Sequence, residues 1–382
     1  MRASLHRVSA VSLLGCACAA FGWTPPARVA ATPDGSTAAH VVTDAQGNAH
    51  VVWHEGKEIV YSNNTGGAFS RPEPLTSGGG RQSFGGDIAV SGKGIYVVYF
   101  HNPEGKSANV YFRRKSGRDW TPAVQISDLP NCRYPWIAVA RKAGPAAVWE
   151  KQDDTGTDSD VYYSELAGSS FSKSRCLSPN SPNGGRYGSM RPAVAISPNG
   201  DVTVVWSDSR TGAYRMYADR RVGGVWQGMQ EIGDEGPVLA GVGVADGQDN
   251  QVHIAYNCPL SHKVKYQRWD GKAWTKPQEL PGNISQPARV RVAVDDRGFV
   301  HAVCDDGGTK EVHYTTNASG SWQPWGNVSN TPNGNSREPD IAFGGGRLIV
   351  VWQESDNAER AAGKEPDIYY SLETLPKKHK AR

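Results

Sequence analysis

The sequence has little of three features that would each indicate a class of protein. Beyond residue 30 it has no apolar run long enough to span a bilayer, which argues against a transmembrane segment there. Its formal net charge is only +3 and its charged residues are scattered, so neither nucleic acid nor an anionic membrane surface is expected as a partner. Its cysteines include no CxxC pair, so the sequence gives no support to a zinc site.

Several motifs and helical patterns are also missing. The chain has no GxSxG, HExxH, P-loop or EF-hand pattern, and we therefore predict no metal and no cofactor. Cysteines 132, 176, 258 and 304 allow three disulfide pairings, and their spacing does not choose among these and small buried thiols. No long amphipathic helical run follows residue 30, whereas Gly 44, Pro 24, Trp 12 and Tyr 15 supply turns and strands. The composition favours one large all-β domain.

Residues 1–20 predict a secretion signal. Basic side chains at positions 2 and 7 precede an apolar run that is too short for a membrane span and ends in small residues at 17–19. The segment LLGC (13–16) also resembles a lipoprotein box, in which Cys16 would carry the lipid. We expect a secreted or periplasmic protein, with an outer-membrane or cell-surface lipoprotein as the alternative.

The remaining chain repeats one unit about every 48 residues. A short apolar strand recurs seven times, six of them ending in an aromatic residue: VVW (51–53), VVY (97–99), AVW (147–149), VVW (204–206), IAY (254–256), AVC (302–304) and VVW (350–352). Each copy follows another apolar strand and a tight turn such as SPNG (197–200), and precedes a third strand such as DVYYS (160–164). The fourth strand belongs to phrases such as DWTP (119–122). Four short antiparallel strands in seven repeats predict an all-β, seven-bladed β-propeller.

The seventh unit ends without a fourth strand. The phrase FGWTPPARVA (21–30) resembles that missing strand, although it lies at the other terminus. Pairing the two termini within one blade closes the ring and covers an edge that would otherwise be open to aggregation. We therefore expect residues 21–375 to form a single monomeric propeller and residues 376–382 to form a basic tail.

The loops after the second and fourth strands of each unit are expected to share one face. They are long and irregular at 78–87, 150–160, 178–192, 207–215 and 353–367. Long loops on a rigid scaffold commonly carry binding and catalytic groups. Arginines and carboxylates gathered in a sheltered depression there would suit an anionic or hydroxyl-rich ligand, because guanidinium groups pair bidentately with carboxylates.

The turns between third and fourth strands resemble the Asp-box, S-x-D-x-G-x-x-W, of the sialidase-like propeller superfamily. SNNTGGAF (62–69) has Asn64 in the Asp place, and SELAGSSF (164–171) keeps the serine, the glycine and the aromatic residue. A Gly-x-x-aromatic frame recurs at 117–120, 223–226 and 271–274. The resemblance covers nearly the whole mature chain. It implies the fold rather than the chemistry, because these turns lie on the face opposite the long loops.

The resemblance also implies roles for particular residues. Sialidases hold the substrate carboxylate with arginines, use a Tyr nucleophile activated by Glu, and use an Asp as acid/base. CRYPWIAV (132–139) resembles their first arginine motif, with Arg133 at the matching position and Arg191 and Arg337 before the innermost strands of blades four and seven. The substrate-binding candidates are Arg133, Arg191, Arg337, Glu150 and Asp208. The catalytic candidates are Asp153, Asp154, Tyr187, Tyr214 and Glu354.

Three kinds of function stay open. The sequence favours a propeller that binds an acidic or hydroxyl-rich glycan, because familiar sialidases have six blades and no Tyr–Glu pair matches theirs. The first alternative is an exo-acting glycoside hydrolase of sialidase type. A polysaccharide lyase, with His54 or His101 as the base, and a protein-interaction scaffold are further alternatives.

Overall fold

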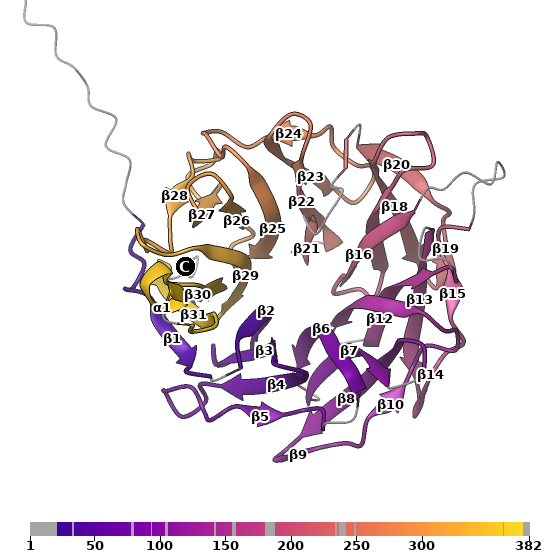
Figure 1. Ribbon diagram of the computed structural model, residues 1–382. Helices are drawn as coiled ribbons and strands as arrows, with labels where there is room; N and C mark the ends of the chain where they lie inside the picture. Colours follow the sequence, from indigo (N-terminus) through magenta and orange to yellow (C-terminus); the bar gives the residue numbers. More distant parts are fainter. Residues whose placement is uncertain are drawn as a thin grey trace, which may run out of the picture.

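The computed structural model describes residues 21–32, 34–77, 80–92, 94–103, 106–140, 143–154, 158–179, 188–233, 235–236, 242–247, 250–361 and 363–376. The leader with Cys16, the catalytic candidate Tyr187 and residues 377–382 of the basic tail lie outside these residues. Seven antiparallel sheets surround a central axis, which Figure 1 views end-on. The predicted seven-bladed propeller is confirmed.

Blades 1 to 4 each run from an innermost strand outward. Blade 1 is β2 (Ser36–Thr43), β3 (Ala49–Glu55), β4 (Glu58–Asn63) and β5 (Glu73–Pro74); blade 2 is β6 (Gly80–Ser91), β7 (Gly94–Pro103), β8 (Asn109–Ser116) and β10 (Val124–Gln125), with β9 (Asp119–Trp120) also pairing β8. Blade 3 is β11 (Cys132–Ala140), β12 (Ala143–Gln152), β13 (Ser159–Ala167) and β15 (Arg175–Cys176), with β14 (Ser170–Phe171) also pairing β13. Blade 4 is β16 (Ser189–Ile196), β17 (Val202–Asp208), β18 (Arg215–Val222) and β20 (Gln230–Gly233), with β19 (Val225–Trp226) also pairing β18.

Blades 5 to 7 follow the same order. Blade 5 is β21 (Val242–Asp246), β22 (Val252–Cys258), β23 (Lys263–Trp269) and β24 (Gln278–Glu279); blade 6 is β25 (Pro287–Val294), β26 (Val300–Asp306), β27 (Glu311–Thr316) and β28 (Gly326–Asn327). Blade 7 is β29 (Ser336–Gly344), β30 (Arg347–Glu354), β31 (Asp367–Thr374) and β1 (Ala27–Ala30), with the short helix α1 (Asn357–Ala361) between β30 and β31.

The two ends of the chain meet in blade 7, as the repeat predicts. β1 pairs antiparallel with β31, placing Arg28 opposite Tyr369. The Arg28 guanidinium donates to the Tyr369 hydroxyl at 2.6 Å and to Glu359 at 2.9 Å. The N-terminal segment therefore supplies the outer strand that closes the ring.

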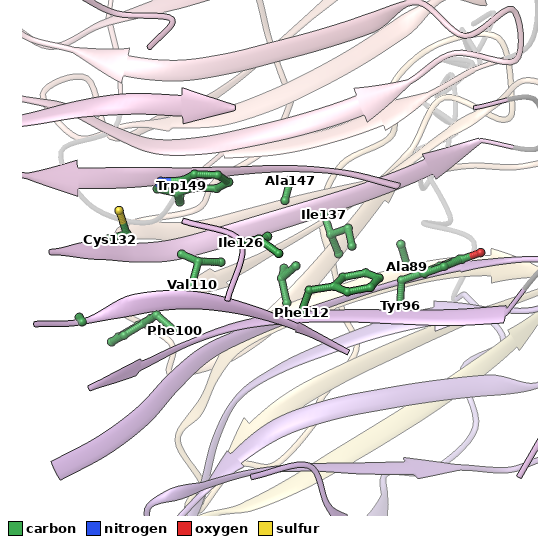
Figure 2. Packing of buried hydrophobic residues seen from close by; sticks show 12 residues of the cluster. Ala89, Tyr96, Phe100, Val110, Phe112, Ile126, Cys132, Ile137, Ala147 and Trp149 are labelled. Carbon is green, nitrogen blue, oxygen red and sulfur yellow. The ribbon is translucent and has the colours of Figure 1, made fainter. Parts of the chain in front are cut away.

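The core lies in the seams between neighbouring blades rather than in one central cluster. Figure 2 shows the seam between blades 2 and 3, where Val110 and Phe112 of β8 lie against Ile137, Ala147 and Trp149 of the next blade. Second strands such as β17 and β22 are buried along their whole length. They read as continuous apolar runs because both of their faces are covered. Burial of each large side chain contributes about 1.5–3 kcal/mol.

Two expectations are corrected by the strand boundaries. β6 begins at Gly80, so most of the predicted loop 78–87 is strand. Arg133, Arg191 and Arg337 lie within β11, β16 and β29 rather than before them. The innermost strands are longer than the apolar pattern suggests, because each continues past a bulge toward the long-loop face.

Two further observations bear on cysteine and membrane. Cys132, Cys176, Cys258 and Cys304 are all free thiols, and only Cys176 is partly exposed. Within the described ranges, no helix has the length and apolar character needed to cross a bilayer.

Candidate functional site

A β-bulge interrupts the innermost strand near the long-loop face in six of the blades with described strands. In blade 3, for example, Arg133 pairs with Glu150 and Trp136 with Val148, so residues 134 and 135 face the single residue Trp149. Five bulge residues have a positive φ: Ala38 (51°), Gly85 (58°), Tyr134 (49°), Arg191 (55°) and Glu338 (55°). Such a backbone costs about 1–3 kcal/mol for a residue other than glycine, and clusters at functional sites.

All five of these bulge residues line one cavity at the axial opening. Its volume is about 580 Å³, and blades 1, 2, 3, 4, 6 and 7 contribute to its wall. The lining includes the guanidinium groups of Arg133, Arg191, Arg289 and Arg291, with Glu338 as its carboxylate. Its apolar and aromatic wall includes Phe100, Tyr134, Pro135, Trp136 and Pro192. The cavity therefore combines an excess of positive charge with flat apolar surfaces.

Arg191 is held in place from two sides. Its guanidinium carbon lies 4.1 Å from the centre of the Tyr134 ring, and its backbone N–H donates to Glu150 Oε1 at 2.6 Å. Glu150 is buried, and burial raises the pKa of its carboxyl group against the opposing effect of Arg191 and Arg133. Glu150 is not among the described lining residues, whereas Arg191, which it contacts, lines the cavity.

Arg289 is held by a chain of carboxylates that links three blades. Its Nη2 lies 2.7 Å from Glu338 Oε1, while Glu338 Oε2 accepts the backbone N–H of Ala38 at 3.0 Å. Asp305 accepts the backbone N–H groups of Arg289 at 2.6 Å and of Glu338 at 3.2 Å. The bulges of blades 6, 7 and 1 are thus fixed to one another by charge-assisted hydrogen bonds.

Trp136, Arg291 and His40 form the inner end of the cavity. The Arg291 guanidinium carbon lies 4.7 Å from the centre of the Trp136 ring, and His40 contacts the same indole edge-on at 5.7 Å. The His40 Nδ1 lies 3.2 Å from Asp87 and 3.5 Å from Asp340. Burial raises the pKa of Asp340, although His40 and Arg291 oppose this. Trp136 and Arg291 also line a second cavity of about 280 Å³ among the innermost strands, so they lie between the two cavities.

The structure brings two of the three predicted arginines to this cavity. Arg133 and Arg191 both line it. Arg191 holds in blade 4 the bulge position that Tyr134 holds in blade 3, whereas Arg133 lies one residue before that position. Arg337 lines a separate hollow of about 390 Å³ beside Asp305 and Asp306, and donates to Asn335 at 2.9 Å. The predicted convergence of Arg337 on the axis is therefore corrected.

Asp208 and Glu354 make hydrogen bonds within their own blades. Each accepts the indole N–H of the tryptophan two residues earlier in its strand, Trp206 at 3.2 Å and Trp352 at 2.9 Å. Asp208 also accepts from Ser189, and Glu354 from Ser336. Burial raises the pKa of Asp208, but hydrogen bonds from Arg210 outweigh burial and leave it below its ordinary value.

The other described candidates are not part of the axial lining. Asp153 and Asp154 follow β12, and the Tyr214 carbonyl accepts the Gly236 N–H in the loop before β18. Burial lowers the pKa of His54 to about 4, and burial also lowers the pKa of His101.

Sequence reasoning missed Arg289, Arg291, Tyr134, Trp136, His40 and Glu338 as lining residues. The segment PARVRV (287–292) starts the innermost strand of blade 6, as CRYPWI (132–137) does in blade 3. Comparing the starts of all innermost strands would have found its two arginines. Their convergence with Glu338 depends on the bulges, which the sequence pattern does not reveal.

Comparisons with known proteins show the fold. No family model matches the chain, and no curated protein matches it. A protein of unknown function from Dyadobacter fermentans is similar at 12% identity and a TM-score of 0.55, covering 92% of this chain and 99% of that one. The polysaccharide lyase Uly1 is similar at 8% identity and a TM-score of 0.57, covering 91% of each chain. An ulvan lyase of a new polysaccharide lyase family is similar at 10% identity and 0.57, covering 88% of this chain and 94% of that one.

Proposed function

We propose that the axial cavity binds an acidic glycan through a sugar carboxylate. The observation that carries this proposal is the convergence of Arg133, Arg191, Arg289 and Arg291 on one apolar-walled cavity. Guanidinium groups pair bidentately with a carboxylate, and partial removal from water strengthens the contact. Flat apolar surfaces suit the C–H face of a sugar ring.

Two of these arginine side chains are already held by contacts within the protein. Arg289 is paired with Glu338, whereas Arg191 is 4.0 Å from Glu150 through Nε and stacks on Tyr134. Arg133 Nε is buried and has no hydrogen-bond partner among the described residues. A ligand carboxylate placed between Arg133 and Arg191 would compensate both charges, at little cost in ordering the protein.

The experiment is a titration with uronate-containing oligosaccharides and with neutral oligosaccharides of the same length. Arg133→Ala and Arg191→Ala should each weaken binding of the acidic ligand at least tenfold, about 1.4 kcal/mol. Arg337→Ala is the matched control, because Arg337 lines a different hollow, and its affinity should stay within about twofold of wild type. The proposal is contradicted if all three variants bind the acidic ligand as tightly as wild type does. It is also contradicted if wild type binds the neutral ligands as tightly as the acidic ones.

Cleavage of such a glycan by β-elimination is the second candidate. Two structures similar to this chain are polysaccharide lyases, and Tyr134, a phenol that lines the cavity, stacks with Arg191. In this reaction a base removes the proton at C5 of a uronate, the C4–O bond breaks, a C4–C5 double bond forms, and the leaving oxygen takes a proton. Ultraviolet absorbance of the new double bond measures it, and Tyr134→Phe should abolish it while ligand binding is kept.

A hydrolase of sialidase type is less well supported. It requires a tyrosine activated by a glutamate, and Glu338, the carboxylate in the lining, is engaged by Arg289 and by the Ala38 N–H. Export, as a secreted or periplasmic protein or as a lipoprotein anchored through Cys16, stays a prediction, as does the monomeric state.

A further inference from the structure

A repeated pair of aromatic residues fills the outer part of the seams between blades. One aromatic residue comes from the third strand of a blade, and the ring that meets it edge-on comes from the segment before the fourth strand of the next blade. Tyr61 thus meets Trp120 at 5.2 Å, and Tyr163 meets Trp226 at 4.9 Å. The third-strand position is held by Tyr61, Phe112, Tyr163, Tyr266, Tyr314 and Tyr370 in six blades.

Blade 4 departs from this pattern at two neighbouring positions. Its third-strand residue is Ala218, opposite Val205 of β17. In blades 1, 5 and 6 the tyrosine accompanies a buried histidine of the second strand, as in the 2.7 Å contact between His253 Nδ1 and the Tyr266 hydroxyl. Blade 4 has Thr203 in the place of that histidine. Both members of the pair are therefore small in this blade alone.

A cavity of about 530 Å³ lies where the missing ring would be, between blades 4 and 5. Ala218 and Arg220 of β18 line one side, and Trp269 of β23 and Trp274 line the other; Figure 1 shows β18 and β23 in adjacent blades. Asp201 of the turn between β16 and β17 also contributes. This turn lies on the face opposite the axial cavity, so the two sites are separate.

The Arg220 side chain in this cavity is fixed by contacts within the protein, and one buried donor of the cavity lacks a hydrogen-bond acceptor among the described residues. The Arg220 guanidinium carbon lies 4.0 Å from the centre of the Trp269 ring, and Arg220 Nε donates to Thr203 Oγ1 at 3.2 Å. Its nearest carboxylate, Asp201, is 3.9 Å away. The buried indole N–H of Trp274 has no hydrogen-bond partner among the described residues. Trp269 and Trp274 lie edge to face with 5.9 Å between their centres.

We propose that the seam between blades 4 and 5 is a second binding site, which takes the pyranose ring of a sugar. A pyranose is about as broad as the phenol ring that the other seams contain, and its C–H face suits an indole surface. Its hydroxyl groups can accept from Arg220 and donate to Asp201, which an aromatic hydrocarbon could not do. The inference does not depend on the axial site, because the two cavities share no residue.

The next seam provides the comparison within the same molecule. Between blades 5 and 6 the tyrosine is present, and Tyr266 meets Trp322 at 5.0 Å. The equivalent hollow there is smaller, about 400 Å³. It has Asn317 in place of Trp269, so it offers one indole wall rather than two.

The decisive variant is Ala218→Tyr, which restores the ring found in the other blades. The probes are the methyl pyranosides of glucose, galactose, mannose and glucuronic acid, followed by saturation-transfer NMR and by the indole N–H signals of Trp269 and Trp274. A ligand of this size should bind with a dissociation constant of about 1 mM and shift these two signals. Ala218→Tyr should weaken that binding at least tenfold while its melting temperature stays equal to or above that of wild type.

Trp269→Leu is the second variant, because it removes the indole that lines the cavity and holds the Arg220 guanidinium, without filling the cavity. It should cause a similar loss. Arg191→Ala is the control for the axial site and should leave the seam signals responding as in wild type. The proposal is overturned if none of the four pyranosides shifts the Trp269 and Trp274 signals at about ten times the expected dissociation constant. It is also overturned if a probe binds Ala218→Tyr and Trp269→Leu as tightly as it binds wild type.

Discussion

The Arg191 guanidinium stacks on the Tyr134 ring at a distance of 4.1 Å, and the two residues occupy the same bulge position in adjacent innermost strands. Both have a positive φ, so each bulge turns its residue into the lining of the axial cavity. The cation is therefore positioned by a neighbouring blade before any ligand arrives. Because the long Arg191 side chain is already ordered, ligand binding would cost less side-chain conformational entropy.

Replacing Tyr134 should show how much its ring contributes to ligand binding. Tyr134→Ala removes the stacking surface and should weaken binding of an acidic glycan about three- to tenfold, roughly 0.7–1.4 kcal/mol. Tyr134→Phe keeps the ring and should bind within about twofold of wild type. Isothermal titration of both variants measures these effects. Full affinity in Tyr134→Ala would show that the stacked arrangement does not contribute to binding.

Glu150 should act through Arg191 rather than through the ligand. Glu150→Ala leaves the Arg191 backbone N–H without its acceptor, which should cost about 1–3 kcal/mol of stability and weaken binding of the acidic glycan. Glu150→Gln keeps an acceptor oxygen and should restore most of the stability and the affinity. Chemical unfolding and ligand titration on the three proteins test this prediction. An alanine variant with unchanged affinity would exclude a positioning role for Glu150.

Closure of the ring predicts a large effect from a short deletion. Residues 21–30 supply β1, and the rings of Phe21 and Trp23 lie 4.7 and 5.1 Å from that of Tyr314. Deleting 21–30 should expose the β31 edge and open the seam between blades 6 and 7, so the protein should aggregate or melt at a much lower temperature. Deleting 377–382 is the control and should leave the melting curve unchanged. A monomeric 21–30 deletion that melts as wild type does would argue against closure by β1.

Stability should fall as the pH drops below about 6.5. Burial lowers the pKa of His253 to about 4, so the unfolded chain takes up a proton at this position before the folded protein does. The contribution is complete above pH 6.5 and is lost between about 6.5 and 4, up to about 3 kcal/mol. His253→Asn should therefore lose less stability over this interval in urea unfolding, whereas the exposed His262→Asn should follow wild type. Parallel profiles for wild type and His253→Asn would contradict this cause.

The ring itself could be predicted because its signal is local and repeated. The second strand of each blade is covered on both faces and must be apolar. Every unit therefore contains a similar short apolar run, such as VVW at 204–206. The partner of β31 could also be predicted, because FGWTPPARVA repeats the phrase that precedes the other fourth strands. These features depend on pairing within a blade or on completing it.

The sites could not be predicted in the same way, because they depend on contacts between blades. Arg133 and Arg337 share one register position, yet only Arg133 lines the axial cavity, and Arg191 reaches it from the next position. A shift of one residue at a bulge turns a side chain to the other face of its strand, and the hydrophobic pattern does not specify that shift. Ala218 likewise opens a cavity only because Trp269 and Trp274 of the next blade stand across the seam. The sequence by itself determined seven blades and their closure, whereas the tertiary structure alone decided which side chains meet at the axis and in the seams.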